Sequence, residues 1–117
     1  MPNPTALFLD DERFPPQDGR AWHVVRTVAQ AVRWVKEHGA PAYISFDNDL
    51  QRRLEGRHFA QWLVRCDVER GGHFLPADFA FYVHSQNSVN GIQGLLEPYL
   101  AQREELNQRL AQRPRAW

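Results

Sequence analysis

The 117-residue sequence has little of what would tie it to a membrane or to an oxidising compartment. No stretch approaches the roughly 20 apolar residues that a bilayer-spanning helix needs. The amino terminus also lacks the basic-then-apolar layout of a signal peptide. The single cysteine, Cys66, cannot form an internal disulfide, and it lies in an apolar helical pattern that places it in a core. We therefore expect a cytoplasmic protein.

An excess of charge of one sign is also missing. The chain has 14 Lys and Arg against 14 Asp and Glu, so its formal net charge is zero. Without a net positive charge we expect no broad nucleic-acid surface, and any RNA contact would be local. The length and the 43% hydrophobic content fit one compact core. We expect a single domain over residues 1–117, in which 103–117 form a charged helical or solvated tail.

Short apolar runs alternate along the chain with longer segments of helical periodicity. Such alternation predicts an α/β domain with a parallel sheet and covering helices. Pro98 lies inside the last helical segment and crowds the carbonyl of Gly94, so we expect a kink or a break there. The strand patterns cover 6–9, 22–26, 43–46 and 79–83, and the helical patterns run from Val28 to Gly39, from Gly56 to about Gly71 and from Ile92 to Leu100.

Acidic residues follow the first and the third of these strands directly. In a doubly wound sheet the first strand lies beside the third, so the ends of strands one, three and four meet at the edge where ligands bind. Four carboxylates in one crevice repel one another unless a cation neutralises them, and magnesium prefers carboxylate oxygens, water and phosphate. We therefore predict a site for magnesium or another oxygen-preferring cation, although such aspartates also cap helices and begin turns. No His/Cys cluster has the spacing typical of zinc. The four carboxylates are those of Asp10, Asp11, Asp47 and Asp49.

The fourth strand ends in a polar run that starts with His84. The near-neutral intrinsic pKa of histidine suits it to move protons, although a lone histidine is more often structural. Ser85 is a candidate nucleophile or phosphate-binding hydroxyl. Neighbouring residues on a strand point to opposite faces, so we expect His84 and Ser85 to have separate roles. Asn87 either donates to a phosphate oxygen or caps the next helix.

Arginine side chains near these acids suit phosphate, because the guanidinium group offers paired donors. Arg13 ranks first, since it stands three residues after Asp10. The alternative for Arg52, Arg53 and Arg57 is that they solvate a loop and the start of a helix.

Three runs together resemble one known family, the cyclic-phosphate processing receiver domains. The runs are Leu9-Asp10-Asp11-Glu12-Arg13, Ser45-Phe46-Asp47-Asn48-Asp49-Leu50 and His84-Ser85-Gln86-Asn87, and the resemblance spans residues 6 to about 97. It implies a three-layer receiver-like (flavodoxin-like) domain with a short, mostly parallel four-stranded sheet and helices on its faces.

The resemblance also implies roles for the matching positions. Asp10 and Asp11 match the metal-binding pair, Asp47 matches the phosphoacceptor position and a further metal ligand, and His84 with Ser85 matches the motif that sets the family apart. Asp49 and Asn87 complete the motifs, and Asn48 stands where histidine is expected, which leaves it a substrate-binding role.

The function that this resemblance favours is metal-assisted hydrolysis of a cyclic phosphate on a nucleotide or an RNA end. His84 would act as general acid or base, and Asp47 or Asp49 would orient water or bind the ion. A non-catalytic module that senses a nucleotide or a phosphorylated end is the alternative. A phosphorelay receiver is disfavoured, because it needs a lysine after a fifth strand and the only lysine here is Lys36.

Overall fold

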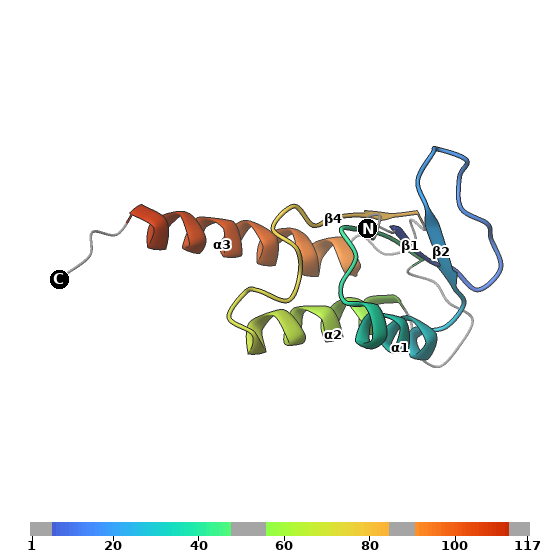
Figure 1. The fold of residues 1–117 in the computed structure, drawn as a ribbon, viewed down its shortest axis with the longest axis horizontal. Coiled ribbons are helices and arrows are strands. Elements are labelled where there is room, and N and C mark those ends of the chain that lie inside the picture. The colour runs from blue at the N-terminus through green and yellow to red at the C-terminus, as the bar shows by residue number, and fades with distance from the viewer. Residues whose placement is uncertain (1–5, 48–55, 85–90, 113–117) are drawn as a thin grey trace.

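The computed structural model describes residues 6–47, 56–84 and 91–112, and it contains the predicted alternation of strands and helices. Figure 1 shows their arrangement. No helix among these residues is both long and apolar enough to cross a membrane. The elements in chain order are β1 (Ala6–Leu9), β2 (Trp22–Val25), α1 (Val28–His38), β3 (Tyr43–Phe46), α2 (Gly56–Glu69), β4 (Ala80–Val83) and α3 (Ile92–Gln112).

The four strands form one parallel sheet in the order β2-β1-β3-β4, which confirms that the first strand lies beside the third. Leu9, Phe46 and Val83 are level with one another at the carboxyl ends of β1, β3 and β4. The pairing extends one residue further, because the amide of Asp47 donates to the carbonyl of Leu9 and that of His84 donates to the carbonyl of Phe46. The residue after each of these strands is therefore held beside its neighbour.

One face of the sheet packs against the helices. Leu7, Leu9, Ile44 and Phe46 are fully buried in a single cluster to which all three helices contribute apolar side chains. Helix α1 is well delimited, since the Thr27 hydroxyl accepts from the amide of residue 30 and a glycine in the left-handed region follows the helix. The receiver-like α/β fold expected from the sequence is confirmed. The expected three layers are not found among the described residues, because all three helices share one core on a single face of the sheet.

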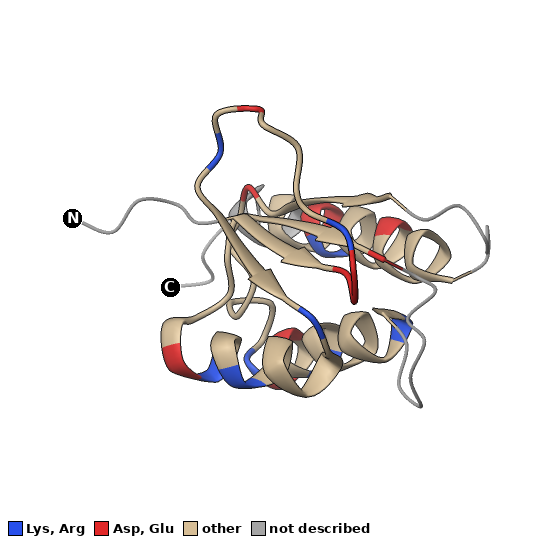
Figure 2. Cartoon of the chain, turned by 90° about the vertical axis from the view of Figure 1, so that its right-hand side faces the viewer, with Lys and Arg blue, Asp and Glu red and all other residues tan. Residues whose placement is uncertain are grey.

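The opposite face of the sheet is rich in aromatic side chains and lies next to residues 10–21, which connect β1 to β2 without a helix. Figure 2 shows this connection on the side of the sheet opposite α1. The register and the alternation of side chains along a strand define the face. It carries Ala6, Phe8, Trp22, Val24, Tyr43, Ser45, Ala80 and Tyr82.

A buried acid ties α2 to α3. The apolar pattern of α2 had assigned Cys66 to the core, but the structure leaves Cys66 half-buried and buries Asp67 completely. One oxygen of Asp67 accepts the amide hydrogens of Phe74 and Leu75, and the other accepts from the Tyr99 hydroxyl. Arg103 forms an ion pair with the same carboxylate at 3.3 Å.

This network also explains why α3 does not break at Pro98. The helix is continuous from Ile92 to Gln112 with Pro98 inside it, so of the kink or break expected there, the break does not occur. Tyr99 and Arg103 lie in the turns directly after the proline and are both bound to Asp67. These contacts tie the helix after Pro98 to α2 and help to offset the backbone hydrogen bond that proline cannot donate.

Burial raises the pKa values of both Asp67 and Tyr99, but the net shifts of these two pKa values are opposite. Burial raises the pKa of Asp67, yet the hydrogen bonds from Tyr99, Leu75 and Phe74 and the charge of Arg103 outweigh it and leave the pKa below its usual value. Burial and the hydrogen bond to Asp67 raise the pKa of Tyr99 to about 12. Tyr99 thus contributes stability fully below pH 10, and the contribution is lost as the pH rises through about 12.

We predict that Tyr99→Phe lowers the free energy of unfolding by about 1.5–3 kcal/mol near neutral pH, because Asp67 loses a charge-assisted hydrogen bond. Urea unfolding followed by tryptophan fluorescence would measure this loss. An ultraviolet titration should show a tyrosinate step near pH 12 that is absent from Tyr99→Phe and unchanged in the exposed control Tyr82→Phe. A wild-type titration without a late step would contradict the assigned network.

Candidate functional site

Three predicted site residues meet where β1, β3 and β4 end. Asp10, Asp47 and His84 each offer one ligand atom, and these atoms lie within 4.8 Å of one another. Asp10 is fully buried and Asp47 is buried, while the His84 side chain is 13% exposed. The register of the three strands produces this meeting, because each residue comes directly after a strand end that is level with its neighbour.

Asp10 is fixed by partners on both of its carboxylate oxygens. Oδ1 accepts the amide hydrogens of Glu12 and Arg13, each at 2.9 Å. Oδ2 lies 2.8 Å from Nε2 of His84. Burial raises the pKa of Asp10, but the two backbone hydrogen bonds and His84 outweigh it and leave the pKa below its usual value. Asp10 is therefore an ionised, buried carboxylate at neutral pH.

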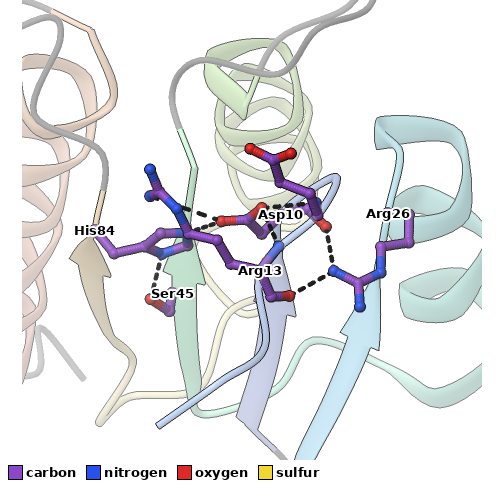
Figure 3. A network of polar contacts seen from close by, with 6 residues as sticks. Asp10, Arg13, Arg26, Ser45 and His84 are labelled. Carbon is purple, nitrogen blue, oxygen red and sulfur yellow. Dashed lines mark hydrogen bonds and ion pairs between the residues drawn. The ribbon is translucent and has the colours of Figure 1, made fainter.

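His84 lies between Asp10 and a serine that sequence reasoning passed over. Nδ1 of His84 is 2.7 Å from Oγ of Ser45 (Figure 3). The ring of His84 also stacks on Phe8, with centroids 4.6 Å apart. An ionised carboxylate only accepts hydrogen bonds, so Nε2 carries a proton toward Asp10. In the neutral ring Nδ1 then accepts from the Ser45 hydroxyl. One available signal was that Ser45 is the only polar residue in the buried strand Tyr43–Phe46.

Arg26 holds the loop that follows β1. Its Nη1 donates to the carbonyl of Asp10 at 3.0 Å and to that of Arg13, and its guanidinium carbon lies 5.2 Å from the centre of the Phe14 ring. Figure 3 shows this side chain reaching across from β2. Sequence reasoning missed Arg26, although its place directly after β2 sets it at the same edge of the sheet as Asp10.

Arg13 is the predicted phosphate ligand that the structure places at the cluster. Its Nη1 is 4.0 Å from Oδ2 of Asp10, and its side chain is 59% exposed, so the guanidinium group can reach a ligand at the mouth of the site. Asp11 is half-exposed and is not one of the three clustered residues, and Arg57 is exposed at the start of α2. The remaining candidates, Asn48, Asp49, Arg52, Arg53, Ser85 and Asn87, lie outside the described residues.

The backbone of Asp47 is packed tightly against the start of α2. A Cβ atom added to Gly56 would lie 2.2 Å from the carbonyl oxygen of Asp47 and 3.1 Å from Cδ1 of Ile92. Only glycine allows this approach, so Gly56 lets α2 begin directly against the acidic cluster.

The donor set of the cluster fits a divalent cation. Asp10 and Asp47 supply carboxylate oxygens, and Mg²⁺ commonly takes one or two of these together with water and phosphate oxygens. His84 can join as a ligand only if the proton on Nε2 moves to Nδ1, and the Ser45 oxygen can accept that proton's hydrogen bond. The same three side chains therefore suit both metal binding and proton transfer.

We predict that Gly56→Ala destabilises the protein by about 1–3 kcal/mol, because the new methyl group forces Asp47 or α2 to shift. Urea unfolding would measure the change against Gln61→Ala, an exposed substitution on the same helix. Wild-type stability in Gly56→Ala would contradict the close contact.

Because the pKa of Asp10 is lowered in the folded protein, the free energy of unfolding depends on pH in the acidic range. Its contribution is present above the ordinary aspartate pKa of about 3.9 and is lost as the pH falls through the lower folded value. We predict that Asp10→Asn flattens the fall in unfolding free energy below about pH 4, whereas the exposed control Asp78→Asn does not. Parallel pH profiles for wild type and Asp10→Asn would count against an ionised, buried Asp10.

The chain is similar to one known protein family and to solved structures. A sequence model of the family described as the cyclic-phosphate processing receiver domain matches residues 5–94. The structure resembles the N-terminal domain of a response regulator/sensory box/GGDEF three-domain protein from Carboxydothermus hydrogenoformans, with 19% identity, a TM-score of 0.50, and 92% of this chain and 95% of that chain covered. The comparison with curated proteins gives no match.

A second solved structure is described as a yeast Spc42 trimeric coiled-coil segment fused to another protein. It has 16% identity and a TM-score of 0.49, over 95% of this chain and 89% of that one. With 19% identity and a TM-score of 0.50, the first of these two structures shows a shared receiver-like fold. The TM-score of the second is too low to support any conclusion.

Proposed function

Because the chain belongs to the family of cyclic-phosphate processing receiver domains, we propose that its site hydrolyses a cyclic phosphate on a nucleotide or an RNA end with the help of a divalent cation. The observation that carries the proposal is the meeting of Asp10, Asp47 and His84 within 4.8 Å. A pair of carboxylates beside a histidine offers both the ligands and the proton carrier that phosphoester hydrolysis needs.

Asp10 and Asp47 would hold the cation, and Asp11 is the further acid that the family resemblance favours as a ligand. When bound, the ion would polarise a phosphoryl oxygen and neutralise charge that develops there. Arg13 would bind another phosphate oxygen, since its guanidinium group lies at the exposed side of the cluster.

His84 would supply proton transfer. In the reaction a water adds to phosphorus, the bond to one ring oxygen breaks, and that oxygen takes a proton, which leaves a phosphomonoester. The Nε2 proton of His84 is held in the cluster, and Ser45 supports the ring at Nδ1. His84 would give its proton to the leaving oxygen and recover one from the attacking water. Ser45 and Phe8 act as positioning residues for the ring.

Transfer of phosphate to Asp47, as in a signalling receiver, fits this chain less well. Lys36 lies on the exposed side of α1, and among the described residues no strand follows β4. The lysine that would pair with a phosphorylated aspartate is therefore lacking at the cluster.

We predict that the protein converts 2′,3′-cyclic nucleotides to phosphomonoesters in the presence of Mg²⁺ and not after chelation. His84→Ala should lower the rate by about 10²–10⁴-fold, the usual contribution of a general acid or base. His73→Ala, which removes an exposed histidine away from the cluster, is the matched control and should keep the wild-type rate. Phosphorus NMR of the reaction mixture would follow substrate and product.

The same experiment separates the enzyme from a sensor. Ligand that binds to the wild type but is returned unchanged with Mg²⁺ present would overturn hydrolysis and favour a nucleotide-sensing module. Equal rates for wild type and His84→Ala would overturn the proton-transfer role of His84. The cation site is tested separately, by whether the wild-type rate is lost after chelation.

A further inference from the structure

A cavity on the aromatic face of the sheet adjoins the proposed catalytic cluster. Its volume is about 530 Å³, which lies within the range of small-molecule sites. The cavity shares His84 with the cluster, and Ser45, which contacts Nδ1 of His84, also lines it. The other ring nitrogen of His84 faces the carboxylate of Asp10. The lining of the cavity also includes Phe8, Arg13, Phe14, Trp22, Tyr43 and Tyr82.

Part of this lining is held rigidly. The indole Nε1 of Trp22 donates to Oδ1 of Asp18 at 3.0 Å, and the Arg20 guanidinium carbon lies 4.2 Å from the centre of the Tyr43 ring. Trp22 also contacts the rings of Tyr43 and Phe8. A surface that is already ordered costs little conformational entropy when a flat ligand lies on it.

Two further rings of the cavity remain open to solvent. The Tyr82 residue is 53% exposed and Phe14 is 81% exposed, although both are large hydrophobic residues. Exposed aromatic rings beside a basic side chain are the usual means by which proteins bind unpaired bases, since every base can stack on an aromatic face.

Charge distinguishes one end of the cavity from the other. Arg13 lines the cavity and also lies 4.0 Å from Asp10, so its guanidinium group joins the aromatic part to the cluster. A ligand that matches this arrangement has a flat ring at one end and an anion at the other. A nucleotide has this form.

We propose that this cavity is the base-binding part of the site, in which Tyr82 and Phe14 stack on the nucleobase while Arg13 and His84 contact the adjoining phosphate. The inference rests on the proposed function for the identity of the phosphate group, and it adds the subsite that would select a nucleotide over other cyclic phosphates. Because stacking on a ring face does not read the hydrogen-bonding edge of a base, we expect little discrimination between bases.

The test is titration calorimetry in buffer without divalent cations, so that no turnover interferes. Three probes are compared, namely 2′,3′-cyclic AMP, the base-free methyl riboside 2′,3′-cyclic phosphate, and adenosine. Tyr82→Ala should weaken 2′,3′-cyclic AMP and adenosine about tenfold and leave the base-free compound unchanged. Tyr82→Phe should bind like the wild type, and Leu106→Ala, an exposed apolar change on α3, is the control.

The outcomes separate this inference from the proposed function. Equal affinity of wild type and Tyr82→Ala for 2′,3′-cyclic AMP overturns the base subsite, whether or not the cyclic phosphate is hydrolysed. Loss of adenosine binding in Tyr82→Ala without any hydrolysis by the wild type supports the subsite and overturns the proposed enzyme. If light scattering shows a dimer that Tyr82→Ala dissociates, the aromatic face binds a second copy and the inference falls.

Discussion

The buried, ionised carboxylate of Asp10 is the constraint on which the rest of the site depends. Removing a carboxylate from water costs several kcal/mol unless its oxygens are fully hydrogen-bonded. Here the amides of Glu12 and Arg13 bind one oxygen and His84 binds the other. The turn after β1 and the end of β4 must therefore take these positions for the fold to tolerate the charge, and the site geometry is set by the same contacts that stabilise it.

A second buried acid shows that a depressed pKa alone does not mark a functional group. Asp67 shares with Asp10 complete burial and a lowered pKa. Its carboxylate, however, binds Tyr99, Arg103 and two amides inside the contact between α2 and α3. Asp10 instead adjoins another carboxylate, a histidine and an exposed arginine. These neighbouring groups can bind a ligand, whereas the partners of Asp67 are used within the contact between two helices.

The connection between β1 and β2 links the cluster to the aromatic face. Parallel neighbours are usually joined through a helix, but residues 10–21 make this crossover without one. Arg26 clamps the start of the connection through the carbonyls of Asp10 and Arg13, and Asp18 meets Trp22 further along. One segment thus supplies both the buried acid and part of the wall of the neighbouring cavity.

The local pattern of residues determined the strands, the helices and the places where polar residues follow the strands. Apolar runs that end at Asp10, Asp47 and His84 can be recognised from the sequence without knowing which segments they pack against. Strand register decided which side chains meet, and it paired His84 with Ser45, 39 positions away, and with Asp10, 74 positions away. Helix packing likewise buried Asp67 and not its neighbour Cys66, since Tyr99 and Arg103 stand on another helix. Contacts between distant segments depend on how the elements pack, and no spacing along the chain encodes them.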